Sequence, residues 1–189
     1  LGTLHDRVTR IEWITEELLT QLGLSLIHSN HARRAAKFCK HDLVSQMVGE
    51  FPELQGIMGA KYLLAEGEAR DVSLAVLEQY LPRGQGSDLP KSFAGSALAL
   101  VDRLELLLSI FAKGERPSGS SDPYALRRAA NGVLNIIWDQ EWNVNLFNLL
   151  FCSIKHWNKI LGSLNVNSDL LLNDLLDFFH QRITSLLEE

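Results

Sequence analysis

The stretch SFAGSALALVDRLELLLSIF, residues 92–111, decides the fold. Within it Leu100, Leu104 and Leu107 recur at steps of three and four, which places them on one face of an α-helix. The spacing predicts one long helix here, and the density of apolar side chains predicts that it is buried. Charged residues keep every apolar run in the chain below the roughly 18 residues that a membrane-spanning helix needs, so we expect no membrane span.

The residues before this stretch carry the same helical spacing. Apolar residues at steps of three and four predict an amphipathic helix over 3–23 and a second helix over 31–48. Pro52 fits early in a third, short helix, which Gly56 and Gly59 are expected to interrupt or end. These segments predict several short helices that pack against the long one.

The rest of the chain is predicted to be helical too. Asp122 is a suitable N-cap, and Pro123 after it fits the first position of a helix. The helices predicted outside the segments already described lie at about 71–81, 123–138, 145–161 and 168–187. Since no stretch alternates between polar and apolar residues with a period of two, the expected fold class is all-α.

Residues 113–121 give the strongest linker signal, because glycine, proline and serine are concentrated there. We therefore divide the chain into a helical domain at 1–113 and a helical extension at 114–189. A short loop between two helices has a similar composition, so the extension could also pack as part of the same domain.

Composition limits the classes of function. The 189 residues carry a net charge of −5, with 46 % hydrophobic and 22 % charged residues, as in an ordinary globular protein. Cys39 and Cys152 fit neither a zinc motif nor a disulfide framework, which favours a reducing cytoplasm. A protein that binds nucleic acid with its whole surface is normally basic, so any RNA contact here requires a local basic patch.

One group of polar residues could form a metal site. His41 and Asp42 are adjacent, and Asp102 lies in the long helix; a His–Asp pair with a distant carboxylate can hold a divalent metal in the HD arrangement. The arrangement also needs a histidine from the first helix, where Arg7 stands instead. We therefore expect no bound metal and, in its place, a structural polar cluster of Arg7, His41, Asp42 and Asp102. A metal-dependent phosphohydrolase of the HD type remains the alternative.

Two groups of basic residues could contact a phosphate backbone. The first lies on the second predicted helix, where steps of three and four put three side chains on one face and a fourth at its edge; its members are Arg33, Lys37, Lys40 and, at the edge, Arg34. Arg127 and Arg128 form the second, near the start of another helix. A solvated helix face has the same pattern, so RNA contact is one of two interpretations.

Four longer strings resemble a known family in their order and spacing. They are DLVSQMVGEFPELQG (42–56), EQYLPR (78–83), ALVDRLE (99–105) and PSGSSDPYALRRAA (117–130). Together they resemble the β subunit of the heteromeric glycyl-tRNA synthetase of bacteria and plastids, over about residues 1–140. One departure is His41, since family members do not consistently have a His–Asp pair at this place.

The resemblance implies a function that the residues alone do not. In that family the enzyme joins glycine to its tRNA using ATP, the α subunit carries the class II catalytic core, and the β subunit binds tRNA and partners α. This chain would be an internal, HD-like part of β, without the amino-terminal domains and the anticodon-binding domain, located in the cytoplasm or the plastid stroma.

For this part of β the resemblance implies contributions to tRNA binding and subunit assembly, with tRNA(Gly) and the α subunit as partners. We expect no catalysis by this segment alone and no cofactor in it, although the whole enzyme uses ATP. A module that docks the α subunit without touching RNA is a further alternative.

Overall fold

The structure is a computed structural model that describes residues 1–23, 25–84, 86–157 and 162–188. Within these ranges the secondary structure is helical, with one isolated bridge between serines and no strand, which confirms the all-α class. The long helices are α1 (Leu4–Leu22), α2 (Leu26–Phe38), α6 (Phe93–Ala112), α7 (Leu126–Asp139), α8 (Leu146–His156) and α10 (Ser168–Leu187). The shorter ones are η1 (His41–Val44), α3 (Gln46–Glu50), η2 (Pro52–Leu54), α4 (Ile57–Ala65) and α5 (Arg70–Glu78).

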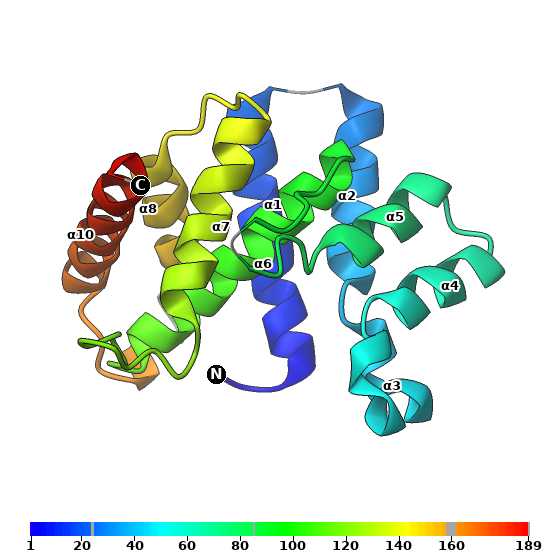
Figure 1. Cartoon of the computed structure of the whole chain (residues 1–189), viewed down its shortest axis with the longest axis horizontal. Coiled ribbons are helices and arrows are strands. Elements are labelled where there is room, and N and C mark those ends of the chain that lie inside the picture. The colour runs from blue at the N-terminus through cyan, green and yellow to red at the C-terminus, as the bar shows by residue number, and fades with distance from the viewer. Residues whose placement is uncertain (24, 85, 158–161, 189) are drawn as a thin grey trace.

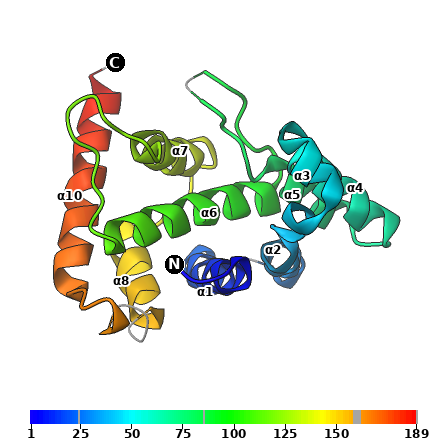
Figure 2. The same cartoon turned by 90° about the horizontal axis from the view of Figure 1, so that it is seen from below.

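Helix α6 is the centre of the molecule. It crosses between α1 and α2 on one side and α7 on the other, while α10 lies near its C-terminal end and α5 near its N-terminal end (Figures 1 and 2). Ser92 caps it, because its hydroxyl accepts a hydrogen bond from the amide of Gly95 at 3.0 Å. The long helix expected over 92–111 is therefore confirmed as the element on which the others pack.

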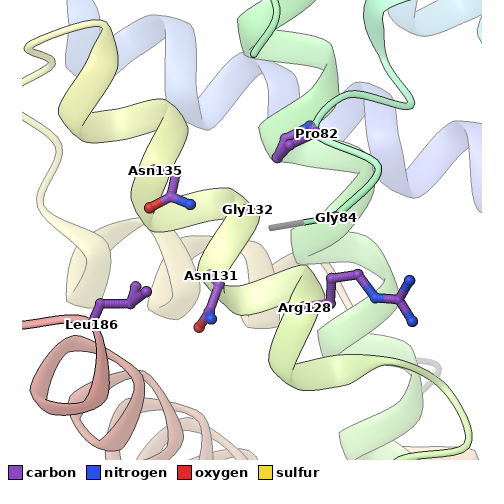
Figure 3. A pocket seen from close by; sticks show the side chains of 7 residues that line it. All are labelled: Pro82, Gly84, Arg128, Asn131, Gly132, Asn135 and Leu186. Carbon is purple, nitrogen blue, oxygen red and sulfur yellow. The ribbon is translucent and has the colours of Figure 1, made fainter. Parts of the chain in front are cut away.

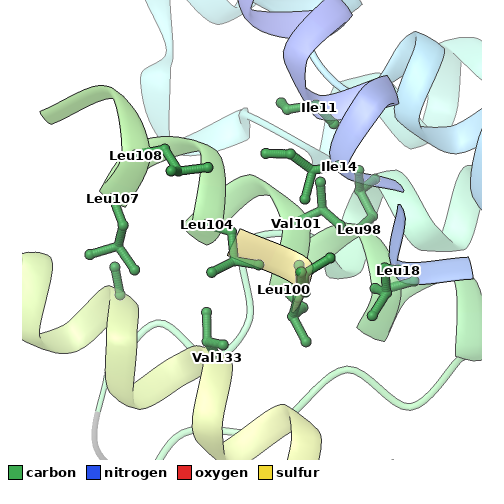
Figure 4. Close-up of a cluster of buried hydrophobic side chains, with 14 of the residues drawn as sticks. Ile11, Ile14, Leu18, Leu98, Leu100, Val101, Leu104, Leu107, Leu108 and Val133 are labelled. Carbon is green, nitrogen blue, oxygen red and sulfur yellow. The ribbon is translucent and has the colours of Figure 1, made fainter. Parts of the chain in front are cut away.

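The core forms where the apolar faces of α1 and α7 meet α6 (Figure 4). The side chains labelled there are Ile11, Ile14, Leu18, Leu98, Leu100, Val101, Leu104, Leu107, Leu108 and Val133, and all are fully buried. Each buried side chain of this size stabilises the fold by roughly 1.5–3 kcal/mol. None of the described helices is long and apolar enough to cross a membrane.

The helix expected over 31–48 is wrong at both ends. Helix α2 begins earlier, at Leu26, and ends at Phe38, after which the chain forms the 3-10 turn η1 and the separate helix α3. Ser45 caps α3, because its hydroxyl accepts a hydrogen bond from the amide of Val48. Side chains that bind backbone groups in this way compete with continuation of a helix, which explains the break.

The expected break by glycine is right at Gly56 and wrong at Gly59. Gly56 separates η2, which begins at Pro52, from α4, but Gly59 lies inside α4 and does not interrupt it. Gly59 has a local role instead: a Cβ there would lie 3.0 Å from the Asp42 carboxylate, so only glycine lets this carboxylate come so close.

The start of α7 differs from the expected proline-led helix. The helix begins at Leu126, three residues after Pro123. Asp122 still binds its first turn, because its carboxylate accepts hydrogen bonds from the amides of Leu126 and Arg127 at 2.7 and 3.0 Å.

The remaining predicted helices agree with the structure apart from their ends. Helix α5 ends three residues before the expected end of 71–81, and α10 spans the expected 168–187. Of the helix expected over 145–161, residues 158–161 lie outside the described residues.

The domain division and the HD-like topology stay predictions. Helices α7 and α10 contact α6, and α8 contacts α1, so helices from both sides of the 113/114 division pack together.

Candidate functional site

Asp102 is the centre of a buried ion-pair cluster on α6. Its Oδ1 accepts a hydrogen bond from Arg7 Nη2 of α1 at 2.9 Å, and its Oδ2 accepts one from Lys40 Nζ at 2.9 Å. Only 3 % of the Lys40 side chain and 12 % of the Asp102 side chain are exposed. A buried carboxylate is tolerated when cations bind it, and here two cations share one carboxylate.

A second carboxylate, one helical turn further along α6, extends the cluster. Glu105 Oε2 lies 2.9 Å from Arg7 Nε, and Glu105 Oε1 lies 2.9 Å from Nη2 of the buried Arg10. The hydroxyl of Ser109 also donates to Glu105 Oε1 at 2.7 Å. Two arginines three residues apart on α1 thus bind two acids three residues apart on α6, which joins the helices.

Burial and charge act in opposite directions on the pKa values of the cluster. Burial raises the pKa of Asp102, but the charges of Lys40 and Arg7 outweigh it and hold that pKa below its ordinary value. Burial lowers the pKa of Lys40, but the charge of Asp102 outweighs it and raises that pKa. Both groups are therefore charged at neutral pH.

Uncharged partners complete the cluster. Gln79 Oε1 accepts a second hydrogen bond from Lys40 Nζ at 2.9 Å, and Gln79 Nε2 donates to the Cys39 carbonyl at 2.8 Å. Among the described residues Arg103 donates only to backbone carbonyls, those of Gln79, Ala99 and Pro82, at 2.8–3.1 Å. Burial lowers the pKa of Arg103, and the charge of Asp102 offsets this lowering only in part.

Of the expected cluster of Arg7, His41, Asp42 and Asp102, the structure joins only the first and last. Asp42 Oδ2 instead accepts hydrogen bonds from the amides of Gly56 and Gly59 at 2.7 and 3.2 Å. His41 Nδ1 lies 2.6 Å from the Phe38 carbonyl. In the described part of the chain, no hydrogen bond or ion pair links either residue to Arg7 or Asp102.

The groups around Asp102 do not suit a metal. Both of its oxygens are bonded to cations, and a metal ion beside two further cations would be strongly repelled in this buried site. Among the described residues, no group of three or more His, Cys, Asp or Glu side chains converges to hold a metal.

The basic face expected on the second helix is partly wrong. Lys40 does not share a solvent face with Arg33 and Lys37, because α2 ends at Phe38 and Lys40 is buried against Asp102. Arg33 forms a bidentate pair with Glu16, at 2.6 and 2.9 Å.

Arg34 likewise binds Glu68 on α2's exposed surface. Of the four basic residues proposed here, Lys37 alone is exposed and has no hydrogen-bond or ion-pair partner among the described residues. The α2 surface therefore carries less free positive charge than the sequence suggests.

The second basic pair is divided between two environments. Arg127 Nη2 donates to the Gly119 carbonyl at 2.8 Å. Arg128 is exposed and forms neither hydrogen bonds nor ion pairs with the described residues. It borders three adjoining cavities, one of which is shown in Figure 3, where its guanidinium points away from Asn131 and Leu186.

Sequence reasoning missed three members of the cluster. Arg10, Gln79 and Glu105 were not proposed, and Lys40 was assigned to the solvent face. The sequence did contain a signal for the two charged residues: Arg7 and Arg10 lie three apart on one otherwise apolar helix, and Asp102 and Glu105 lie three apart on another. Charges on apolar helix faces need partners, so this spacing indicates that the two pairs face each other. Gln79 has no comparable signal, since it lies in a loop.

Comparison with known proteins identifies one family. The family model described as Glycyl-tRNA synthetase beta subunit matches residues 1–189. The chain is 49 % identical over 190 residues to the glycine–tRNA ligase beta subunit of Trichodesmium erythraeum, which covers 100 % of this chain and 26 % of that protein.

More distant bacteria have similar proteins. The chain is 47 % identical over 183 residues to the subunit of the same name from Chromohalobacter salexigens, and 40 % identical over 183 residues to that from Bacillus subtilis. These matches cover 96 % and 97 % of this chain, and 25 % of each relative. The chain thus spans about a quarter of the length of the curated relatives it matches.

Proposed function

The chain belongs to the glycyl-tRNA synthetase β-subunit family, and from this we propose that it is a non-catalytic, RNA-facing part of glycine–tRNA ligase. It contributes to binding of tRNA(Gly) and to assembly with the α subunit, while ATP-dependent charging takes place elsewhere in the enzyme. The observation that carries the proposal is the ion-pair cluster at Asp102. In it Asp102, the carboxylate of the expected HD-type site, binds Arg7 and Lys40 and joins α6 to α1.

The same cluster argues against the phosphohydrolase alternative. A metal-activated water needs an open coordination position, and the oxygens of Asp102 are already bonded to Arg7 and Lys40. Purified chain should therefore contain no stoichiometric iron, manganese or zinc in elemental analysis. Stoichiometric metal, lost on replacement of Asp102 by asparagine, would favour the hydrolase.

For tRNA contact the proposal places more weight on Arg127 and Arg128 than on the α2 surface. Arg128 has no hydrogen-bond or ion-pair partner in the part of the chain that the structure describes, whereas Arg33 and Arg34 are each paired with a glutamate. A phosphate that binds Arg33 or Arg34 must compete with that carboxylate. Arginine that is free of such a partner can bind a phosphate with two parallel hydrogen bonds.

Two double variants with the same charge change test this choice. Arg127→Gln with Arg128→Gln should weaken binding of tRNA(Gly) and lower the slope of log K against log salt by about 2, one unit per lost contact. Arg33→Gln with Arg34→Gln is the matched control and should leave the slope nearly unchanged. If the control loses more binding than the first variant, the α2 surface is the RNA contact.

Docking of the α subunit is the second candidate, supported by exposed apolar side chains around α3. Val44, Met47 and Phe51 are 81 %, 41 % and 46 % exposed. Exposed apolar residues that are neighbours in sequence are typical of protein contacts. Met47→Glu with Phe51→Glu should reduce co-purification with the α subunit and leave tRNA binding intact. If co-purification is unchanged, α docks elsewhere.

A further inference from the structure

A small cavity with an excess of positive charge lies beside the Asp102 cluster. Its volume is about 180 Å³, and it is lined by residues of α1, α6, α7 and the loop that follows α5. Its charged lining consists of Arg7, Asp102, Arg103 and Arg128. Three arginines and one acid therefore line this space.

That carboxylate does not neutralise the cavity. Asp102 and Glu105 are already shared among Arg7, Arg10 and Lys40, so two negative charges serve three cations. Among the described residues Arg103 donates only to carbonyl oxygens, and Nη1 of Arg7 is bonded to neither acid of the cluster. Arg128 on the opposite wall has no hydrogen-bond or ion-pair partner among the described residues.

We propose that this cavity is a binding site for a phosphate group. A phosphate supplies the missing negative charge and several acceptor oxygens, and guanidinium groups bind it through paired, charge-assisted hydrogen bonds. The volume is below the roughly 300–1,000 Å³ of sites for drug-sized ligands, which suits a small anionic group rather than a whole nucleotide. Arg128 and Nη1 of Arg7 are the donors that contact the phosphate, and Arg103 contributes charge.

The remainder of the ligand has space next to the cavity. Two neighbouring cavities, of about 420 and 380 Å³, share Pro82 and Arg128 with it. The larger one is also lined by Arg83, which forms no ion pair with the described residues, and by one acid, Glu53. A phosphate that belongs to an RNA strand or to a free nucleotide can therefore bind in the small cavity with its sugar and base outside. The inference rests on the proposed function only where RNA supplies the phosphate.

Phosphate titration of the 189-residue chain tests the site. Inorganic phosphate should raise the melting temperature beyond a sodium chloride control of equal ionic strength. Arg128→Gln should lower the affinity for phosphate by roughly tenfold or more, since a charge-assisted hydrogen bond is lost. Arg33→Gln, at an exposed arginine of α2 outside the cavity, should bind phosphate as the parent does.

Three outcomes would overturn the site. They are no phosphate-dependent stabilisation of the parent chain, equal affinity in Arg128→Gln and the parent, and an equal loss in Arg33→Gln, which would indicate surface charge alone. Arg128 is exposed, so folding of its variant is checked directly by its melting temperature without phosphate.

Further arms identify the source of the phosphate. If a short RNA with a 5′-phosphate binds more tightly than the same RNA with a 5′-hydroxyl, the phosphate belongs to an RNA end. If adenosine monophosphate binds at least as tightly as the 5′-phosphorylated RNA, the phosphate belongs to a free nucleotide. If phosphate binding depends on Arg128 but the parent does not bind tRNA(Gly), the phosphate site is supported and the RNA-facing function is contradicted. If the parent binds tRNA(Gly) but not phosphate, the RNA-facing function is supported and the phosphate site is contradicted.

Discussion

Asp42 is fully buried and Asp102 largely buried, and the protein binds these two carboxylates in different ways. Asp102, between α1 and α6, is bonded to two cationic side chains, Arg7 and Lys40. Asp42, in the turn after α2, accepts hydrogen bonds from the backbone amides of Gly56 and Gly59. The first carboxylate is held by charge and the second by backbone dipoles.

The difference indicates what each site can tolerate. At Asp102 a neutral replacement leaves the buried Lys40 without its counter-ion and leaves Arg7 with Glu105 as its remaining carboxylate. At Asp42 the partners are neutral amides, which need an acceptor but not a negative charge. Substitution by asparagine removes the charge and keeps an acceptor oxygen, so it separates the two cases.

The largest expected effect is that of Asp102→Asn. It should lower the free energy of unfolding by about 3 kcal/mol, because removal of one partner leaves buried charge uncompensated. Asp42→Asn should cost only about 1 kcal/mol, since the acceptor for both amides is retained. Urea denaturation of both variants measures the difference. Equal losses would show that charge has no special role at Asp102.

A smaller effect distinguishes two lysines three residues apart. Lys40→Met should cost about 2 kcal/mol, because it leaves Gln79 without its donor and Asp102 with one cation instead of two. Lys37→Met is the matched control and should change the free energy by less than about 0.5 kcal/mol, since Lys37 is exposed. A loss at Lys40 as small as that of the control would contradict the burial of Lys40 after the end of α2.

The smallest expected effect is a loss of stability at low pH. Because the pKa of Asp102 in the folded state lies below its ordinary value, its contribution is present at neutral pH and is lost as pH falls through the folded pKa. The chain should therefore lose stability below about pH 4, where unfolded aspartate begins to bind protons.

The variant Asp102→Asn separates the contribution of Asp102 to stability from that of the other carboxylates. The difference in stability between parent and variant should shrink as pH falls from 5 towards 2. The urea midpoint at each pH measures this difference. The same comparison with Asp42→Asn provides the reference for a carboxylate held by amides. A difference that stays constant for Asp102→Asn would mean that its pKa is not lowered.

Much of the fold was predictable because its signals are local. Apolar residues at helical spacing predicted the all-α class, the central helix at 92–111 and the last helix at 168–187. Errors occurred where a side chain binds the backbone: residues 31–48 were predicted as one helix, but Ser45 starts a new one.

The candidate site was predictable only in part. Arg7 and Asp102 were expected together and do form an ion pair. Lys40 was assigned to the solvent face because the spacing from Lys37 assumed a continuous helix. That assumption fails after Phe38, where the chain turns and Lys40 becomes buried.

The sequence by itself therefore determined the helices, the all-α class and the family, because each depends on periodicity or on ordered strings of residues. Only the tertiary structure decided which charges meet. Asp42 binds amides 14 and 17 residues further along, and Asp102 binds Arg7 and Lys40 across 95 and 62 residues. Such contacts arise from the packing of whole helices, and neither propensity nor spacing within one segment contains them.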